Sequence, residues 1–368
     1  MTQPSADDDA LNDARQRIDA LDQQIQALIN ERAGVAVQVA EIKQRQGRTD
    51  FYRPEREAQV LARVAERNAG PLPDQAMARI VREIMSACLA LEQPMTVAYL
   101  GPEGTYTQAA VYKHFGHAVA ASPHAAINDI FRDVEAGNAH FGVVPVENST
   151  EGVVSHTLDQ LVGSALIICG EVALPVHHHL LSHERDISCI KRVVAHAQSL
   201  AQCRNWLDSH MPGVVREAVS SNGEAARRVA GENGAAAIAA RAASDYYDLP
   251  ILASNIEDDP NNTTRFLVLG RQSVPRSGRD MTSILVSIHN RPGMLYRLLA
   301  PAAEAGVDLA RIESRPSRRQ AWDYNFFIDM EGHADDPPVR RVIEAIQSEA
   351  ALIKILGSYP RSIGLEAE

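Results

Sequence analysis

Apolar residues recur in alternating steps of three and four along the first 45 residues of the chain. The recurring positions are Ile18, Leu21, Ile25, Leu28, Val35, Val39 and Ile42. Arg32 fills, in register, the place between Leu28 and Val35. This spacing predicts one long helix with a narrow apolar seam, seven residues for every two turns.

Two further helices are predicted before residue 93. Pro54 fits the start of a helix over residues 55–68, and Asp74 can cap a third over residues 75–92. Three helices with so little else around them bury their apolar faces best against a second copy of the chain. Residues 10–92 are therefore expected to form an all-α module that dimerises.

Charged residues on the long helix suggest a ligand. Arg32 sits where an apolar residue belongs, and a buried guanidinium needs a partner carboxylate or a ligand. Lys43 lies about 16 Å further along nearly the same face, which leaves a gap the size of a ring molecule. Arg15 lies about 25 Å before Arg32, so it would serve a partner's site. A solvated or ion-paired coiled-coil edge is the alternative.

After residue 94 the pattern changes to short apolar runs that alternate with amphipathic stretches. The predicted strands are 97–100, 141–146, 166–169, 193–195, 236–239 and 266–269, and the predicted helices include 107–115, 127–136 and 225–231. This alternation predicts mainly parallel sheets covered by helices. We prefer two lobes to one large sheet, with residues near 177–250 in the second lobe and a ligand in the cleft.

Polar clusters lie at the ends of these strands, where α/β folds place ligands. Residues 101–106, 145–152 and 196–203 each lead from a strand toward a helix, and residues 261–266 (Asn-Asn-Thr-Thr-Arg-Phe) open the last strand. A rigid strand end can hold a proton donor beside an anion binder, although a polar turn is the plainer interpretation. Four such turns are expected to converge on one site.

The last part of the chain follows a polar linker over residues 271–280. Strands are predicted over 283–288, 308–313, 324–330 and 353–358, and helices over 294–304 and 339–350. The order βαββαβ predicts a ferredoxin-like module.

Composition narrows the classes of function. The formal net charge of −11 argues against binding to nucleic acid or to an anionic membrane surface. The acidic start is no secretory signal, and no apolar run reaches membrane-spanning length. The four cysteines lack metal-ligand spacing and read as reduced cytosolic thiols. The triplet at 177–179 is no strong metal site, because neighbours on an extended segment point to opposite faces.

The helical module resembles the all-helical chorismate mutase family, whose dimers are intertwined. The resemblance rests on Arg15, Ala20-Leu21-Asp22, Glu31-Arg32, Lys43 and Arg56-Glu57. It implies a Claisen rearrangement of chorismate to prephenate, carried by positioning and by stabilisation of the ether oxygen. The resemblance implies that the substrate carboxylates are bound by Arg32, Arg56 and the Arg15 of the partner chain. Lys43 contacts the ether oxygen, and Glu57 contacts the ring hydroxyl.

Three positions depart from the family pattern. Arg53, Cys88 and Glu92 stand where an Asp, a Ser and a Gln can occur. The Gln donates to the ether oxygen, and an ionised Glu cannot donate, so Glu92 would have to be protonated. Cys88 and Glu92 stay in the expected site, and mutase activity is expected to fall as pH rises.

The middle segment resembles prephenate dehydratase. The motifs are Gly-x-x-Gly-Thr-Tyr, Val-Glu-Asn-Ser, His-x-Gln-x-Leu-x-Gln-Cys and Thr-Arg-Phe, in that order. The resemblance implies that prephenate loses carbon dioxide and water together to give phenylpyruvate. Thr264 is then the proton donor, Arg265 holds the dianion and Phe266 packs the ring. The remaining substrate-binding positions are Thr105, Glu147, Asn148, Ser149 and Gln202.

The C-terminal segment resembles the ACT domain fused to prephenate dehydratases. There, Gly-Ala-Leu and Glu-Ser-Arg-Pro motifs bind phenylalanine across a dimer interface. The corresponding residues here are Gly293, Met294, Leu295, Glu313, Ser314, Arg315 and Pro316. Met294 is bulkier than the family's Ala. A dimerisation module without a ligand is the alternative.

Together the segments predict a multidomain, cytoplasmic enzyme of at least two copies that resembles bifunctional chorismate mutase–prephenate dehydratases. The expected domains are 10–92, 95–272 and 280–368, with phenylalanine as feedback inhibitor. No cofactor or metal is expected, because neither step transfers electrons or requires a Lewis acid. Two alternatives stay open: a dehydratase with a degenerate helical dimerisation arm, and a non-catalytic amino-acid sensor.

Overall fold

The computed structural model describes residues 6–47, 52–289, 291–316 and 324–362. The chain forms two compact units. The first contains Met1–Tyr52, Val64–Pro94 and Gly116–Val119, and the second contains Arg53–Arg63, Met95–Phe115 and Ala120–Glu368. Among the described residues, no helix is long and apolar enough to cross a membrane.

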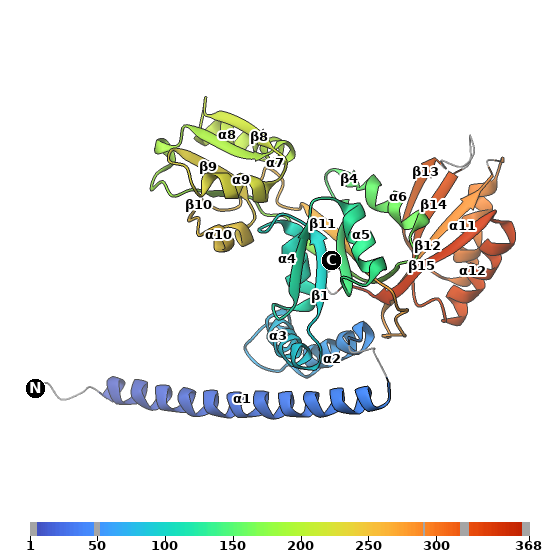
Figure 1. Cartoon of the computed structure of the whole chain (residues 1–368), viewed down its shortest axis with the longest axis horizontal. Helices are drawn as coiled ribbons and strands as arrows, with labels where there is room; N and C mark the ends of the chain where they lie inside the picture. Colours follow the sequence, from blue (N-terminus) through green and yellow to red (C-terminus); the bar gives the residue numbers. More distant parts are fainter. Residues whose placement is uncertain (1–5, 48–51, 290, 317–323, 363–368) are drawn as a thin grey trace, which may run out of the picture. The chain divides into compact units, whose positions relative to one another are not determined.

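The first unit is helical. Its long helix α1 (Ala6–Arg45) packs against α3 (Asp74–Glu92) (Figure 1). The helix α2 (Pro54–Arg67), whose residues up to Arg63 belong to the second unit, begins at the predicted proline. The prediction of one long helix with an apolar seam is confirmed. Asp74 does not cap α3, because it is the first helical residue and its carboxylate accepts a hydrogen bond from Asn68. That detail of the prediction was wrong.

The second unit begins with a lobe that we call the first lobe. Its sheet has the order β2-β1-β3-β11-β5, with β4 (Gly152–Val153) paired to β3. The strands are β1 (Thr96–Leu100), β2 (Ala120–His124), β3 (Phe141–Asn148), β5 (Ile167–Pro175) and β11 (Thr263–Gly270). The helices are α4 (Tyr106–Phe115), α5 (Ile127–Ala136) and α6 (Ser155–Gly163).

A second sheet forms the second lobe, in the order β10-β6-β9-β7-β8. Its strands are β6 (His179–Leu181), β7 (Arg192–His196), β8 (Val215–Val219), β9 (Ala235–Ala239) and β10 (Ile251–Ala253). Its helices are α7 (Ala197–Gln202), α8 (Arg204–His210), α9 (Asn222–Val229) and α10 (Arg241–Tyr247). The two sheets confirm two lobes rather than one large sheet.

The expectation of mainly parallel sheets was wrong. β1 runs parallel to β2 and β3, but β11 runs antiparallel to both of its neighbours, β3 and β5. The reason is the path of the chain. β11 returns from the second lobe and enters the middle of the first sheet from the opposite end.

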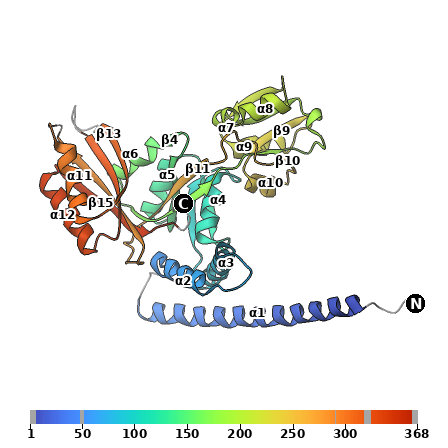
Figure 2. The ribbon, with the colours of Figure 1, turned by 180° about the vertical axis from the view of Figure 1, so that it is seen from behind.

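The C-terminal module has the predicted βαββαβ order. Its antiparallel sheet is arranged β13-β14-β12-β15, from β12 (Asp280–Ile288), β13 (Leu309–Pro316), β14 (Tyr324–Glu331) and β15 (Leu352–Pro360). Helices α11 (Met294–Ala305) and α12 (Pro337–Glu349) lie together on one face (Figure 2). Period-two alternation gives that face Ile284, Val286 and Ile328. The other face carries Leu285 and Phe327, which join the core of the first lobe.

Candidate active sites

Thr264 and Asn148 are opposite one another on the antiparallel strands β11 and β3. The Nδ2 of Asn148 donates to Thr264 Oγ1 over 2.8 Å and to Asn262 Oδ1 over 2.7 Å. The Oδ1 of Asn148 accepts from the main-chain nitrogens of Thr150 and Glu151, each over 3.0 Å. Main-chain N–H groups only donate, so this turn fixes which side of the amide faces Thr264.

The fixed orientation of the Asn148 amide determines the hydrogen-bonding role of the Thr264 hydroxyl. Because Asn148 donates to Thr264 Oγ1, the hydroxyl acts as an acceptor toward Asn148. Its own hydrogen is then available to a ligand, since a hydroxyl has one donor and two acceptor positions. The half-buried Thr264 therefore has the local geometry of a hydrogen-bond donor.

Ser149 holds the end of the same strand pair. Its Oγ accepts from the main-chain nitrogen of Thr263 over 2.9 Å, and its own nitrogen donates to Thr263 O over 2.9 Å. The side chain of this predicted binding residue is thus used to fix where β11 starts.

Arg265 and Glu147, also predicted to bind substrate, leave the two strands on the face opposite Thr264. They are cross-strand neighbours, and both reach residues of the C-terminal module. Arg265 lies 2.8 Å from Asp329, and Glu147 lies 3.0 Å from Arg311. Phe266 is completely buried in the sheet. The structure therefore brings Thr264 and Asn148 together but does not bring Arg265, Glu147 or Phe266 to them.

Gln202 ends α7 in the second lobe and takes part in a chain of polar contacts. Its Oε1 lies 2.8 Å from His178 Nε2, and His178 Nδ1 lies 3.0 Å from the hydroxyl of Tyr106. Burial lowers the pKa of His178 and keeps the ring neutral. Among the described residues, the buried Nε2 of Gln202 has no hydrogen-bond partner. Buried polar atoms are normally paired, which makes Gln202 a candidate ligand-binding residue.

Thr105 has a local role in the same region. Its Oγ1 donates to Pro102 O over 2.9 Å and accepts from the nitrogen of Gln108 over 3.4 Å, at the start of α4. Thr105 thereby places Tyr106, which contacts His178. Sequence reasoning missed Tyr106, His178 and Asn262 as site residues. All three lie in segments that the sequence had already marked, namely residues 101–106, 177–179 and 261–266.

His177 and His178 of the histidine triplet both contact Glu257 beside the same network. His177 Nδ1 lies 2.8 Å from Glu257 Oε1, and the nitrogen of His178 donates to Glu257 Oε2 over 2.8 Å. Within the described part of the chain, no group of three His, Cys, Asp or Glu side chains could hold a metal ion.

In the first unit, the predicted mutase residues Lys43 and Glu92 come together from α1 and α3. Lys43 Nζ lies 3.9 Å from Glu92 Oε2, an oxygen that is buried and has no hydrogen-bond partner among the described residues. Burial raises the pKa of Glu92, although the charges of Lys43 and Arg32 act in the opposite direction. Cys88 is buried one turn earlier on α3. This arrangement favours a protonated Glu92.

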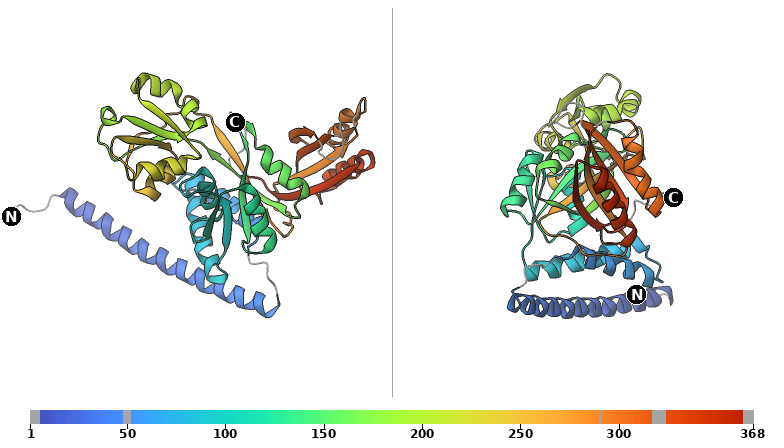
Figure 3. Two further views of the ribbon diagram at one scale, coloured as in Figure 1. Left: turned by 45° about the horizontal axis from the view of Figure 1, so that its top comes forward. Right: turned by 90° about the vertical axis from the view of Figure 1, so that its right-hand side faces the viewer.

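Apart from Cys88, the other predicted mutase residues belong to α1 or lie at the start of α2. Arg15 is exposed on α1, seventeen residues before Arg32. Figure 3 shows α1 as one continuous helix. Arg56 and Glu57 lie in the first turn of α2, within the second unit. Arg53, one of the three departures from the family pattern, forms an ion pair of 2.6 Å with the buried Glu55.

The predicted effector residues divide between two places. Gly293 has φ +80° and precedes α11, Met294 packs against the module's core, and Leu295 is exposed. On β13, Glu313 lines a cavity of ≈ 230 Å³, and Arg315 lies 3.5 Å from Asp159 of α6. Ser314 and Pro316 are exposed.

Three family models match the chain in succession. The family described as chorismate mutase type II matches residues 14–93, prephenate dehydratase matches residues 97–274, and the ACT domain matches residues 282–347.

Relatives match nearly the full length. A bifunctional chorismate mutase/prephenate dehydratase of Pseudomonas aeruginosa is 55% identical over 363 residues, 97% of this chain and 100% of the relative. One of Aquifex aeolicus is 40% identical over 96% of this chain and 98% of the relative. The crystal structure of a prephenate dehydratase in complex with L-Phe from Arthrobacter aurescens has a TM-score of 0.67. It is 35% identical and covers 73% of this chain and 90% of that one.

Proposed function

Because the chain belongs to the family of bifunctional chorismate mutase/prephenate dehydratases, we propose that its own residues carry both reactions in turn. The first unit rearranges chorismate to prephenate. The second converts prephenate to phenylpyruvate, with phenylalanine as feedback inhibitor through the C-terminal module.

The mutase reaction needs a held substrate and a stabilised ether oxygen, and no covalent intermediate. Lys43 and protonated Glu92 donate to that oxygen from two sides. The raised pKa of Glu92, caused by burial, supports this role. Arg32 binds a substrate carboxylate, and Cys88 lines the site beneath Glu92.

The dehydratase reaction makes an aromatic ring by losing two groups. The electron pair of the ring carbon–carboxylate bond becomes a ring double bond as carbon dioxide leaves, and the allylic hydroxyl departs with a proton as water. Thr264 donates to that hydroxyl during C–O cleavage. An alcohol is a weak acid near neutral pH, so Thr264 takes up a proton from solvent water as it gives its own to the departing hydroxide.

The contact that carries the dehydratase assignment is the bond from Asn148 Nδ2 to Thr264 Oγ1, which leaves the threonine hydrogen for the substrate. Gln202 supplies a further polar group, supported by its unpartnered buried nitrogen. Arg265 and Glu147 are not included in this set, because their side chains bind the C-terminal module.

A homodimer is part of the proposal. The apolar seam of α1 is 41–64% exposed in the single chain, at Ile18, Leu21, Ile25, Leu28, Val35, Val39 and Ile42. A second α1 is the natural cover for a heptad seam of this length. Arg15 then binds a carboxylate in the partner's mutase site. A cytoplasmic location fits the four unpaired cysteines.

Chorismate tests the proposal when it is given to the purified protein while prephenate and phenylpyruvate are followed by chromatography, with and without phenylalanine. Both products are expected, and phenylalanine should reduce phenylpyruvate. Chorismate left intact while prephenate is consumed would indicate a dehydratase with a helical arm only. Neither substrate being consumed would indicate an amino-acid sensor.

A further inference from the structure

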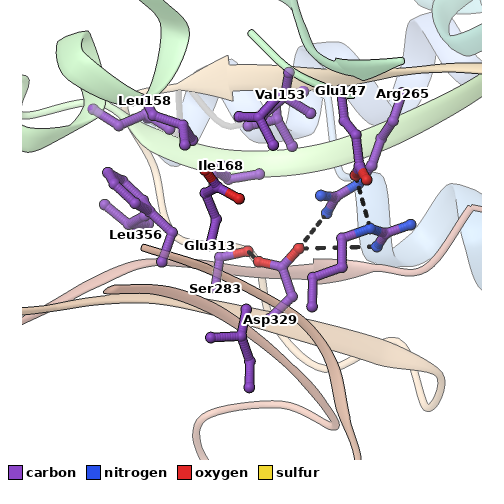
Figure 4. Close-up of a pocket in the computed structure, with 15 residues that line it drawn as sticks. Glu147, Val153, Leu158, Ile168, Arg265, Ser283, Glu313, Asp329 and Leu356 are labelled. Atoms are coloured by element: carbon purple, nitrogen blue, oxygen red, sulfur yellow. Dashed lines mark hydrogen bonds and ion pairs between the residues drawn. The ribbon is translucent and has the colours of Figure 1, made fainter. Parts of the chain in front are cut away.

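Arg265 joins the strand that carries Thr264 to the C-terminal module. Its Nη2 lies 2.8 Å from Asp329 Oδ2 on β14 and donates to the Tyr359 hydroxyl on β15 over 3.0 Å. Its Nε donates over 2.8 Å to Glu171 on β5 of its own sheet. Figure 4 shows Arg265 and Glu147 facing Asp329 and Ser283 across this boundary. One guanidinium is thus held from both sides.

Arg265 and its carboxylate partner Glu171 are buried, so the loss of either ion-pair partner would leave a charge without compensation. The side chain of Arg265 is 7% exposed and that of Glu171 is not exposed at all. Burial opposes the charge of Arg265, but Tyr359, Asp329 and Glu171 outweigh it and raise its pKa. A buried charge that loses one partner is strongly penalised, so a shift of Asp329 would disturb the position of Arg265.

Three strands of the C-terminal module fix the partners of Arg265. Ser283 on β12 donates to Asp329 Oδ1, and its hydroxyl lies 2.8 Å from that of Tyr359. The position of Arg265 therefore depends on the docking of the whole sheet and not on one flexible side chain.

The boundary between the module and the first lobe is tight in one place and open in another. A Cβ added at Gly357 on β15 would lie 2.2 Å from the main-chain oxygen of Ile168 on β5. Beside the ion pairs lies the cavity of ≈ 230 Å³, with apolar walls that include Leu158 and Phe327 (Figure 4). The boundary is therefore close-packed at Gly357 but leaves space beside the ion pairs.

We propose that Arg265 is a positioning residue, through which the docked C-terminal module holds β11 and Thr264 in the geometry that the dehydratase reaction needs. Phenylalanine bound to the module lowers dehydratase activity by shifting the module's sheet away from Arg265. The inference rests on the proposed function of Thr264. Lys43 and Glu92 make none of these contacts, so the mutase reaction is outside this route.

Asp329→Asn in the full-length protein tests the inference, because it removes the carboxylate charge from Arg265 and keeps the shape. We expect kcat on prephenate to fall at least about tenfold with KM changed less than about twofold. The reason is that displacing β11 misplaces Thr264, which affects the chemical step more than substrate binding. We also expect phenylalanine to cause a smaller further loss than in the wild type. Mutase activity should be unchanged. Arg265→Lys keeps the positive charge but loses the forked guanidinium. Its kcat on prephenate should therefore lie between those of the wild type and Asp329→Asn.

Two matched variants sharpen the test. Asp159→Asn removes the ion pair with Arg315 at the same boundary without touching β11, and should behave as wild type. Gly357→Ala pushes the two strands apart without changing any charge, and should reproduce Asp329→Asn. Wild-type kcat and wild-type phenylalanine inhibition in both Asp329→Asn and Gly357→Ala would overturn the inference.

The proposed function fails separately. If Thr264→Val retains dehydratase activity, Thr264 is not the donor and the positioning role falls with it. If Thr264→Val is inactive while Asp329→Asn and Gly357→Ala are normal, only the positioning role is wrong.

Discussion

Thr264 and Arg265 are consecutive on β11, yet the hydroxyl of Thr264 accepts a hydrogen bond from Asn148 on one face while the guanidinium of Arg265 contacts Asp329 on the other. The same division holds for their cross-strand neighbours, since Asn148 pairs with Thr264 and Glu147 with Arg265. One strand pair therefore faces both the proposed chemistry and the regulatory module.

The direction of the Asn148–Thr264 bond predicts the effect of Asn148→Asp. A carboxylate at 148 only accepts, so it would take the hydrogen of Thr264 away from the substrate. We expect kcat on prephenate to fall roughly 100-fold, in the range for loss of one proton-transfer group. Steady-state kinetics on prephenate measure this loss.

Two controls accompany that substitution. Asn128→Asp adds the same charge on an exposed turn of α5 and should leave kcat unchanged. The double variant Asn148→Asp/Thr264→Val should be no slower than the slower single variant, because both remove one interaction. A normal kcat for Asn148→Asp would remove this bond from the mechanism.

The helices and strands could be read from the sequence because hydrophobic period is a local property. The pairing of Thr264 with Asn148 was within reach, since both lie at strand ends in polar clusters. It could also have been predicted that Arg265 points to the face opposite Thr264, because successive side chains on a strand point to alternate faces. The family motif placed Arg265 in the same site as Thr264, whereas the two-residue period of a strand puts their side chains on different faces.

Other features were beyond local reasoning. The antiparallel entry of β11 depends on where the chain returns from the second lobe. The contacts of Arg265 with Asp329 and Tyr359 join residues 64 and 94 positions apart, and only the folded chain selects them. The contact between Tyr106 and His178, 72 positions apart, is of the same kind.

The raised pKa of Glu92 predicts the pH dependence of the mutase. Only the protonated carboxyl donates to the ether oxygen, and it is lost as pH rises through the pKa of the folded protein. Mutase kcat/KM should therefore fall with rising pH, and Glu92→Gln should flatten the profile.

The same group affects stability with a defined sign. The folded protein holds the proton more tightly than the unfolded chain, so this stability is present below the unfolded pKa and lost as pH rises through the folded one. Glu92→Gln should unfold at higher urea than wild type at neutral pH. Glu41→Gln, which removes an exposed carboxylate of α1, is the control. Identical pH profiles for wild type and Glu92→Gln would contradict the role of Glu92.

The exposed seam of α1 predicts the effect of Leu28→Asp. Leu28 is 64% exposed in the single chain, and a charge there would be buried in a dimer. We expect light scattering to show a monomer and mutase activity to fall at least about tenfold, since Arg15 of the partner is then lost. Gln23→Asp, on the far side of α1 at 3.6 residues per turn, should stay dimeric and active. Wild-type mass for Leu28→Asp would argue against this seam.

The most direct test of the account is the time course of Thr264→Val on chorismate. Valine keeps the shape of threonine and removes the hydroxyl, and Thr263→Val is the matched control one residue earlier. We expect Thr264→Val to accumulate prephenate at the wild-type rate and to form phenylpyruvate roughly 100-fold more slowly, with KM for prephenate little changed. Phenylpyruvate formed within a few-fold of the wild-type rate would contradict it.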